Sequence, residues 1–585
     1  MRRAATIGIS VLLAPAAWAA GTLQLSKHNL SVTGSGAIHS STESQTCVFC
    51  HTPHGASPAV PLWNHASSVA SYATYSSSTM KAITPVGQPT GASKLCLSCH
   101  DGTVALGQTV TDGTITLLNT GAGGRMPAGP SNLGTSLTDD HPVSFQRSPA
   151  NTETMDPSPG DGVRLDAQSQ IQCTACHDPH SEDRDTVTKK FLVKSNQRSA
   201  ICASCHRPAY WDANPSAHKT STKPYTAAQG AHTGYGTVQD NGCEGCHRPH
   251  TGSEPQRLLK YLEEGTCDRC HNGSVAAKNI SAEFTKAYVH PTYRTTPSVH
   301  DASEGPQNAA HPLPEIAPGA PRHAECDDCH DPHAAYARTA TAPAASGALN
   351  GGWGIGAAGA RLSPVNYEYQ LCFKCHADSA NKPQPTGLPD PPYTRRQIVQ
   401  FNVRLEFDPA NPSHHAVEAA GRNADVPSLI PPYTTASVIY CGDCHANNAG
   451  PGAGGTGPAG PHGSIYPHIL ERNLNIGANN SGTNFGVMYA MCFKCHSQTS
   501  IMGDVTFREH RTHIDGENTS CTVCHDPHGV SATQGNATNN SNLINFDLDV
   551  VRPSSTGQLR FEDRGNRRGA CYLLCHGSNH NPFTY

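Results

Sequence analysis

The stretch Cys47-Val-Phe-Cys50-His51-Thr-Pro-His54-Gly55 contains a pattern that the rest of the chain repeats. Two cysteines separated by two residues and followed at once by histidine are what covalent attachment of a c-type haem requires. The two thiols add to the vinyl groups of one porphyrin, and the adjoining imidazole lies under the iron as its proximal ligand.

The pattern occurs eleven times, and a twelfth copy carries one extra residue between its cysteines, so the twelve pairs use all 24 cysteines. Because histidine is 34 of 585 residues, twelve pairs each followed by histidine would arise by chance with a probability of about 10⁻¹⁵. We therefore expect twelve covalently attached haems c rather than disulfides or zinc sites. The motifs are Cys47-Cys50-His51, Cys96-Cys99-His100, Cys173-Cys176-His177, Cys202-Cys205-His206, Cys243-Cys246-His247, Cys267-Cys270-His271, Cys326-Cys329-His330, Cys372-Cys375-His376, Cys441-Cys444-His445, Cys492-Cys495-His496, Cys521-Cys524-His525 and Cys571-Cys575-His576.

Residues 1–20 have the features of a signal peptide: a basic start at Arg2 and Arg3, a short apolar run, and Ala17-Trp18-Ala19 as a cleavage pattern. The apolar run is too short to span a membrane, and no later run reaches that length. Export agrees with the motifs, since c-type haem is attached outside the bacterial cytoplasm. We expect a secreted protein, extracellular or on the outer surface, with the periplasm as the alternative.

The composition predicts an unusual core. About 565 residues remain after the signal peptide, or about 47 per haem, with 54 glycines, 45 prolines and a mean hydropathy of −0.46. A chain this poor in apolar periodicity would not bury enough surface to fold by itself. We expect a mostly irregular fold with short helices and little strand, wrapped around a stacked haem chain, with folding coupled to cofactor attachment.

The charge argues against nucleic acid as a partner. The formal net charge is −5, signal-peptide removal makes it about −7, and twelve oxidised haems at about −1 each bring it to about −19. The sequence also contains no Walker loop, dinucleotide fingerprint or zinc-protease motif.

The first third of the mature chain contains recognisable segments: Ser26-Lys27-His28-Asn29-Leu30-Ser31, Pro61-Leu62-Trp63-Asn64, Asp140-His141-Pro142-Val143-Ser144-Phe145 and Phe191-Leu-Val-Lys-Ser-Asn196, set among four haem motifs. It resembles tetrahaem cytochromes of the doubled CxxCH type. That group includes extracellular cytochromes of metal-reducing bacteria, some of which polymerise into electron-conducting filaments. The resemblance implies self-association by analogy alone.

The motif spacing suggests a division into a tetrahaem module at 21–225, haems five to seven at 226–340, and haems eight to twelve at 341–585. Residues 341–360 are rich in alanine and glycine and predict a flexible surface connection. Residues 450–460 predict another glycine-rich loop.

The second axial ligands must come from the 22 histidines outside the motifs. A sixth ligand that is also histidine closes the iron to substrates and suits electron transfer. The strongest candidates stand three residues after a motif histidine, in the pattern CHxPH, and can ligate the next haem: His54, His180, His250, His333 and His528. Single candidates are His28, His141, His218, His232, His300, His415, His468 and His513, with surface or propionate-binding roles as the alternative.

Weaker candidates are His65, His290, His311, His323, His414, His462, His510 and His580. The filament resemblance adds one hypothesis, that His28 is donated to a neighbouring subunit.

These features predict an electron-transfer protein rather than an enzyme, a conduit of closely spaced haems with other cytochromes and extracellular electron acceptors as partners. One alternative is a periplasmic component of a porin–cytochrome conduit. Another is a multihaem reductase of a small anion such as nitrite or tetrathionate. Several such reductases replace a motif histidine by lysine, whereas all twelve motifs here end in histidine. An open iron site would be sought first at the twelfth motif.

Overall fold

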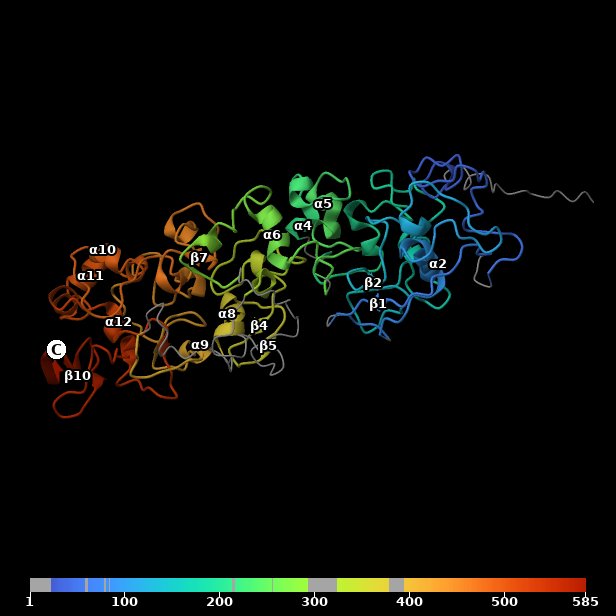
Figure 1. The fold of residues 1–585 in the computed structure, drawn as a ribbon. Coiled ribbons are helices and arrows are strands. Elements are labelled where there is room, and N and C mark those ends of the chain that lie inside the picture. Colours follow the sequence, from blue (N-terminus) through green and yellow to red (C-terminus); the bar gives the residue numbers. More distant parts are fainter. Residues whose placement is uncertain are drawn as a thin grey trace, which may run out of the picture. The chain divides into compact units, whose positions relative to one another are not determined.

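The computed structural model describes residues 23–57, 62–77, 80–83, 85–212, 216–254, 256–292, 324–377 and 394–585. The predicted signal peptide and His300, His311 and His323 lie outside these residues. The chain forms two units (Figure 1): unit 1 comprises Met1–Pro208 and Lys219–Leu262, and unit 2 comprises Ala209–His218 and Glu263–Tyr585. Unit 1 contains the first five motifs and unit 2 the other seven. The module boundaries at 225 and 340 do not coincide with this division and stay predictions.

The helices are short, as predicted, and most of them carry motif cysteines. Frequent glycine and proline prevent longer runs, because neither residue supports a helix interior. Four motifs lie in 3₁₀ turns at Cys202–Ser204, Gly242–Gly245, Cys441–Asp443 and Cys492–Lys494. The α-helices are α2 (Gly91–His100), α3 (Cys173–Cys176), α4 (Ala217–Thr220), α5 (Val238–Asn241), α6 (Glu263–His271), α7 (Cys326–Cys329), α8 (Glu368–His376), α9 (Val403–Glu406), α10 (Phe485–Met488), α11 (Gln498–Met502) and α12 (Cys521–Cys524).

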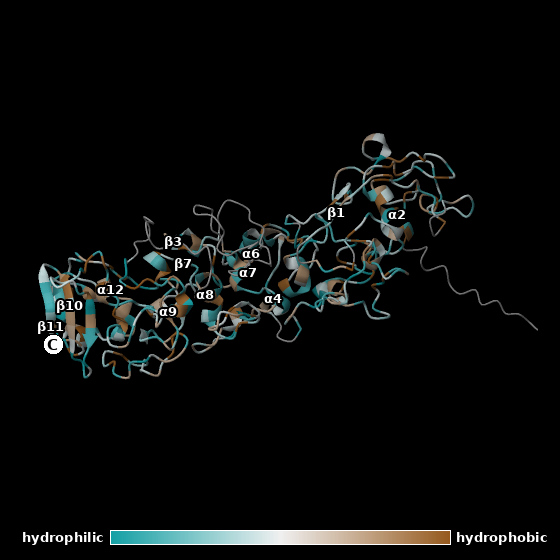
Figure 2. Ribbon diagram, turned by 90° about the horizontal axis from the view of Figure 1, so that it is seen from below, coloured by the Kyte–Doolittle hydropathy of each residue, from teal (hydrophilic) through white to brown (hydrophobic). Residues whose placement is uncertain are grey.

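The strands form small sheets, in agreement with the prediction of little strand. Four are two-stranded: parallel β1 (Ala73–Thr74) and β2 (Ser136–Leu137), and the antiparallel pairs β3 (Tyr288–Val289) with β7 (Gly463–Ser464), β4 (Gly354–Ile355) with β5 (Arg361–Leu362), and β6 (Ser413–His414) with β8 (Gly529–Val530). The largest sheet is antiparallel, in the order β11 (Ser578–Thr584), β10 (Gly569–Cys575) and β9 (Arg560–Asp563). Figure 2 shows hydrophobic residues along β10 and a hydrophilic β11, because β10 faces the interior and β11 is an edge strand.

The apolar side chains gather in several small clusters among the described residues rather than in one core. Five of these clusters include motif cysteines. In unit 1, Phe49 packs beside Cys50 and Cys99. In unit 2, Val523 packs beside Cys524 and Cys575. The apolar side chains are therefore placed where the thiols are.

The segment 341–360 is not the flexible surface connection that its composition predicts. Ile355 is 1 % exposed and packs in a cluster with Phe373 of α8. A Cβ at Gly354 would lie 2.1 Å from the Gln370 carbonyl oxygen, so the strand can approach α8 only with glycine there. The small residues of this segment allow close packing. A composition rich in alanine and glycine is compatible with close packing as well as with flexibility, so composition alone does not distinguish the two.

Candidate haem-binding sites

The first eleven motifs share one local geometry. In α2, α6 and α8 the motif forms the end of the helix. In the other eight motifs the backbone N–H of the motif histidine donates to the carbonyl of the first cysteine, with N···O distances of 2.8–3.1 Å. This bond closes one helical turn, so the two thiols and the imidazole project from the same short segment.

The twelfth motif has a different geometry, because both its cysteines lie on strand β10. Cys575 pairs with Ser578, so His576 and Gly577 form the two-residue turn of the β10–β11 hairpin. Both have positive φ, 43° and 80°, which is the combination that a type I′ turn requires. A left-handed conformation costs a non-glycine residue about 1–2 kcal/mol. The fold therefore holds His576 in a strained position.

Several motif histidines are oriented through Nδ1. This atom lies 2.7 Å from the Ser131 carbonyl oxygen in His100, 2.8 Å from that of Lys190 in His177 and 2.9 Å from that of Ala348 in His330. A carbonyl only accepts, so Nδ1 carries the proton and Nε2 of a neutral ring keeps a free electron pair. Such outer hydrogen bonds fix the tautomer of metal-ligating histidines.

Burial favours the neutral form of several motif histidines. It lowers the pKa of His177, His271 and His445 to about 4. A neutral imidazole is the form that ligates a metal. The rings are thus available as ligands at neutral pH.

Nine motif histidines each face one histidine from outside the motifs, at ring-centre distances of 6.1–6.4 Å. In unit 1 the pairs are His51–His180, His100–His28, His177–His250 and His206–His141. In unit 2 they are His271–His218, His330–His462, His376–His290, His445–His528 and His525–His510.

This spacing fits one metal ion between two imidazoles. A metal–imidazole bond is about 2.0–2.1 Å long, so two such bonds on opposite sides of an iron place the ring centres about 6.2–6.5 Å apart. Two imidazoles in van der Waals contact would stand closer together. The residues therefore fit a haem iron with two histidine ligands at each of the nine pairs.

Three of the five CHxPH histidines face a motif that is two places earlier along the chain, not the adjacent one. His180 of the third motif faces the first, His250 of the fifth faces the third, and His528 of the eleventh faces the ninth. The segment after a motif histidine leaves its own haem site and crosses the site of the preceding motif. It then reaches the site of the motif before that one, which explains the offset of two motifs.

The proline of the CHxPH pattern orients the second histidine of the site that its segment crosses. The Pro179 carbonyl lies 3.1 Å from His28 Nδ1, and the Pro332 carbonyl 2.9 Å from His218 Nδ1. The Pro527 carbonyl accepts from His415 Nδ1 at 2.5 Å. Burial and then the neighbouring His415 lower the pKa of His496 to about 4, so His415 lies beside the tenth motif. One CHxPH segment therefore contributes to two sites: its histidine faces the motif histidine of one, and its proline carbonyl orients the second histidine of the other.

Two of the second histidines are held by buried carboxylates instead. Nδ1 of His250 lies 2.9 Å from Asp140 Oδ1, and Nδ1 of His528 lies 2.9 Å from Glu406 Oε2. Asp140 is 4 % exposed and Glu406 is 7 % exposed. A carboxylate partner raises the basicity of an imidazole ligand more than a carbonyl does.

Other candidates are not shown facing a motif histidine. His54 is exposed and has no ring contact among the described residues. It follows the first motif of the chain, so no motif lies two places before the one it belongs to. His333 lies edge-on to Trp211 at 6.2 Å, and His232 lies 3.5 Å from Glu244. The carbonyl of His468 accepts from Nδ1 of His445 at 2.8 Å, so this residue orients a motif histidine.

The structure raises three weak candidates, His290, His462 and His510, to partners of a motif histidine. No repeated spacing marks them, and the only local signal is a proline next to His290 and His462. Nδ1 of His65, His414 and His39 lies within hydrogen-bonding distance of backbone carbonyl oxygens.

Consecutive motifs contact each other through alternating cysteines, from the first to the fifth motif in unit 1 and from the seventh to the twelfth in unit 2. The first cysteines of two motifs are hydrogen-bonded in the pairs Cys96–Cys173, Cys202–Cys243, Cys372–Cys441 and Cys492–Cys521. The second cysteines interact electrostatically in the pairs Cys50–Cys99, Cys176–Cys205, Cys329–Cys375, Cys444–Cys495 and Cys524–Cys575. Within each of these two series, the order of the sites in space therefore follows their order in the sequence.

The comparisons with known proteins agree with these observations. The model of the doubled CXXCH motif family matches residues 167–209 and 236–276, which contain the third to sixth motifs. A comparison with curated proteins found no match. In the described part of the chain, no helix is both long and apolar enough to cross a membrane. The motifs and the family match support a multihaem c-type cytochrome with covalently bound haem, a protein of electron transfer.

Proposed function

We propose that the chain attaches twelve haems, mostly with two histidine ligands each, and conducts electrons along them. The observation that carries this proposal is the set of nine histidine pairs with the spacing of two axial ligands. A bis-histidine haem supplies reversible one-electron chemistry at an iron without an open position. The second imidazole of each pair occupies the place that a substrate would need, which favours electron transfer over reduction of a small anion.

The protein contributes attachment, orientation and spacing. Cysteines anchor each cofactor, Nδ1 hydrogen bonds orient both imidazoles, and the alternating cysteine contacts keep consecutive attachment sites together. Tunnelling falls off exponentially with distance, so continuous neighbours within each of the two series favour rapid transfer. Two histidine ligands also predict low reduction potentials compared with histidine–methionine cytochromes.

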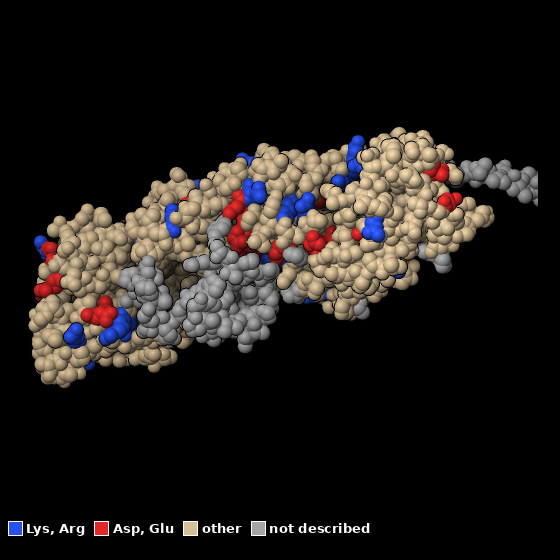
Figure 3. Space-filling view, viewed as in Figure 1, with Lys and Arg blue, Asp and Glu red and all other residues tan. Residues whose placement is uncertain are grey.

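We place this conduit outside the cytoplasm, in extracellular electron transfer, with other cytochromes as donors and an extracellular acceptor. The signal-peptide pattern and the resemblance of the first third to filament-forming tetrahaem cytochromes support this proposal. Figure 3 shows charged side chains of both signs in small mixed groups on the viewed face.

The cofactor proposal is tested by intact mass and absorption spectroscopy of the purified protein. We expect the mass of the processed chain plus twelve haems, no free thiols, and a low-spin spectrum. A bare chain with reactive thiols would refute it.

The location and assembly are tested separately. Surface proteolysis of intact cells distinguishes an extracellular protein, which is degraded, from a periplasmic porin-associated component, which is protected. Negative-stain microscopy tests the polymer, and His28→Ala tests whether this residue ligates a haem within its own chain. The 6.2 Å spacing of His28 and His100 predicts that the variant loses one low-spin haem even in the monomer.

A further inference from the structure

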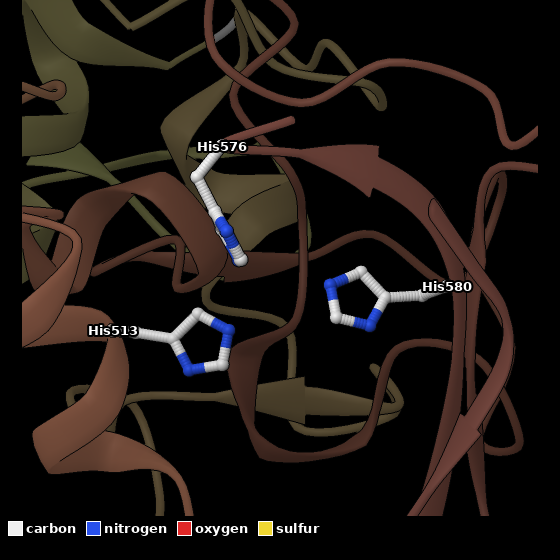
Figure 4. A group of neighbouring side chains, drawn as sticks. All are labelled: His513, His576 and His580. Carbon is white, nitrogen blue, oxygen red and sulfur yellow. The ribbon is translucent and has the colours of Figure 1, made fainter. Parts of the chain in front are cut away.

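The twelfth motif is surrounded by two candidate second ligands. His513 lies on the π-helical segment Thr512–Gly516, and His580 lies on β11. The possible ligand atoms of His513, His576 and His580 all lie within 4.8 Å of one another. Figure 4 shows the three rings converging on one space from three segments. At each of the nine pairs, by contrast, one ring faces the motif histidine.

Both rings stand slightly too close to His576 to be its partner across an iron. The ring-centre distances from His576 are 5.5 Å to His513 and 5.7 Å to His580, against 6.1–6.4 Å at the nine pairs. A displacement of less than about 1 Å would bring either ring to the bonding distance. The geometry therefore does not favour one of them.

Each candidate has a feature that suits it as a ligand. Nδ1 of His513 lies 2.7 Å from the Glu509 carbonyl oxygen, so Nε2 keeps its electron pair, as in the motif histidines. Nε2 of His580 is buried and has no hydrogen-bond partner. A buried polar atom without a partner is costly, and bonding to a metal would remove that cost.

His580 lies on the edge strand β11, opposite Leu573, and the pairing of β10 with β11 is irregular between Cys571 and Leu573. Its ring lies edge-on to Phe583 at 5.4 Å. The ring of His513 lies against Phe507 at 6.0 Å, with an angle of 30° between the two planes. Both candidates are therefore packed against an aromatic ring, and of the two only His580 stands on a strand, one that is paired on one side.

We propose that His513 and His580 are alternative sixth ligands of the haem at the twelfth motif and exchange with one another. This inference rests on the proposed function, since it requires a haem at Cys571 and Cys575. With either histidine as the ligand, a haem at Cys571 and Cys575 would be held by His576 and one further imidazole.

The test uses the purified haem-loaded protein and counts high-spin ferric iron by electron paramagnetic resonance. We expect His513→Ala and His580→Ala each to remain fully low-spin, and the double variant to show one high-spin haem per chain. Free imidazole should return the double variant to the low-spin state, which distinguishes a missing ligand from misfolding. His510→Ala is the matched control, because His510 is the partner of His525 from the same segment, and it should show one high-spin haem by itself.

A high-spin haem in His513→Ala alone would overturn the exchange and leave His513 as the single ligand. A high-spin haem in His580→Ala alone would do the same in favour of His580. Intact mass separates this failure from failure of the proposed function: a wild-type protein with eleven haems has no cofactor at the twelfth motif, whereas twelve haems with a single fixed ligand refute the exchange only.

Discussion

The carboxylate behind His528 should lower the reduction potential of the haem that His528 and His445 would hold. Glu406 is buried and lies 2.9 Å from His528 Nδ1, and His528 faces His445 at 6.2 Å. A negative charge on this hydrogen bond favours the more positive, ferric state of the iron. Replacement of Glu406 by glutamine keeps an acceptor of the same shape and removes the charge.

The size of the effect follows from the change in hydrogen-bond type. A hydrogen bond with a charged partner contributes about 1.5–3 kcal/mol, and a neutral one about 0.5–1.5 kcal/mol. If the difference of about 1–1.5 kcal/mol acts on the ferric state alone, it corresponds to about 45–65 mV for one electron. Glu406→Gln should therefore raise one of the twelve midpoint potentials by about 50 mV.

Spectroelectrochemical titration of the purified protein measures this shift. The haem concerned should account for about one twelfth of the total absorbance change, and this fraction should titrate at the higher potential. Asp140→Asn should give the same result in unit 1, because Asp140 lies 2.9 Å from His250 Nδ1. Glu283→Gln is the control, since Glu283 is equally buried but pairs with Lys286. Unchanged or lowered potentials in Glu406→Gln would contradict the charge argument.

Three further predictions concern other residues. His180→Ala should give one high-spin haem, whereas His54→Ala, at the same position of another CHxPH motif, should change nothing in the monomer; equal spectra would contradict the offset of two motifs. Burial raises the pKa of Glu368 to about 7 from an ordinary 4.5, so the folded state binds more protons than the unfolded chain between these values, and the free energy of unfolding falls as the pH rises through them. Glu368→Gln should lose this dependence when denaturant midpoints are compared at about pH 5 and pH 8, and equal slopes for variant and wild type would exclude Glu368 as the cause. Phe373→Ala should lower the free energy of unfolding by about 3–5 kcal/mol in the same assay, because Phe373 is 0 % exposed; a loss below about 1 kcal/mol would show that its cluster contributes little.

The CHxPH motif illustrates how far sequence reasoning reaches. The pattern predicts His180, His250 and His528 as second ligands because it recurs with one spacing, and the structure places each of them opposite a motif histidine. It does not reveal that each faces the motif two places earlier. That offset depends on the path of the chain between motifs, where no local pattern acts.

The sequence by itself predicts covalently bound haem c, its points of attachment and the motif histidines, because two thiols and an imidazole must lie within one short segment to hold a single porphyrin. Only the tertiary structure decides which second histidine meets each motif and what orients it. The orienting contacts join residues 151 positions apart for His28 with Pro179 and 122 for His528 with Glu406. Separations of this size are fixed by packing of the whole unit, so no local sequence pattern encodes them.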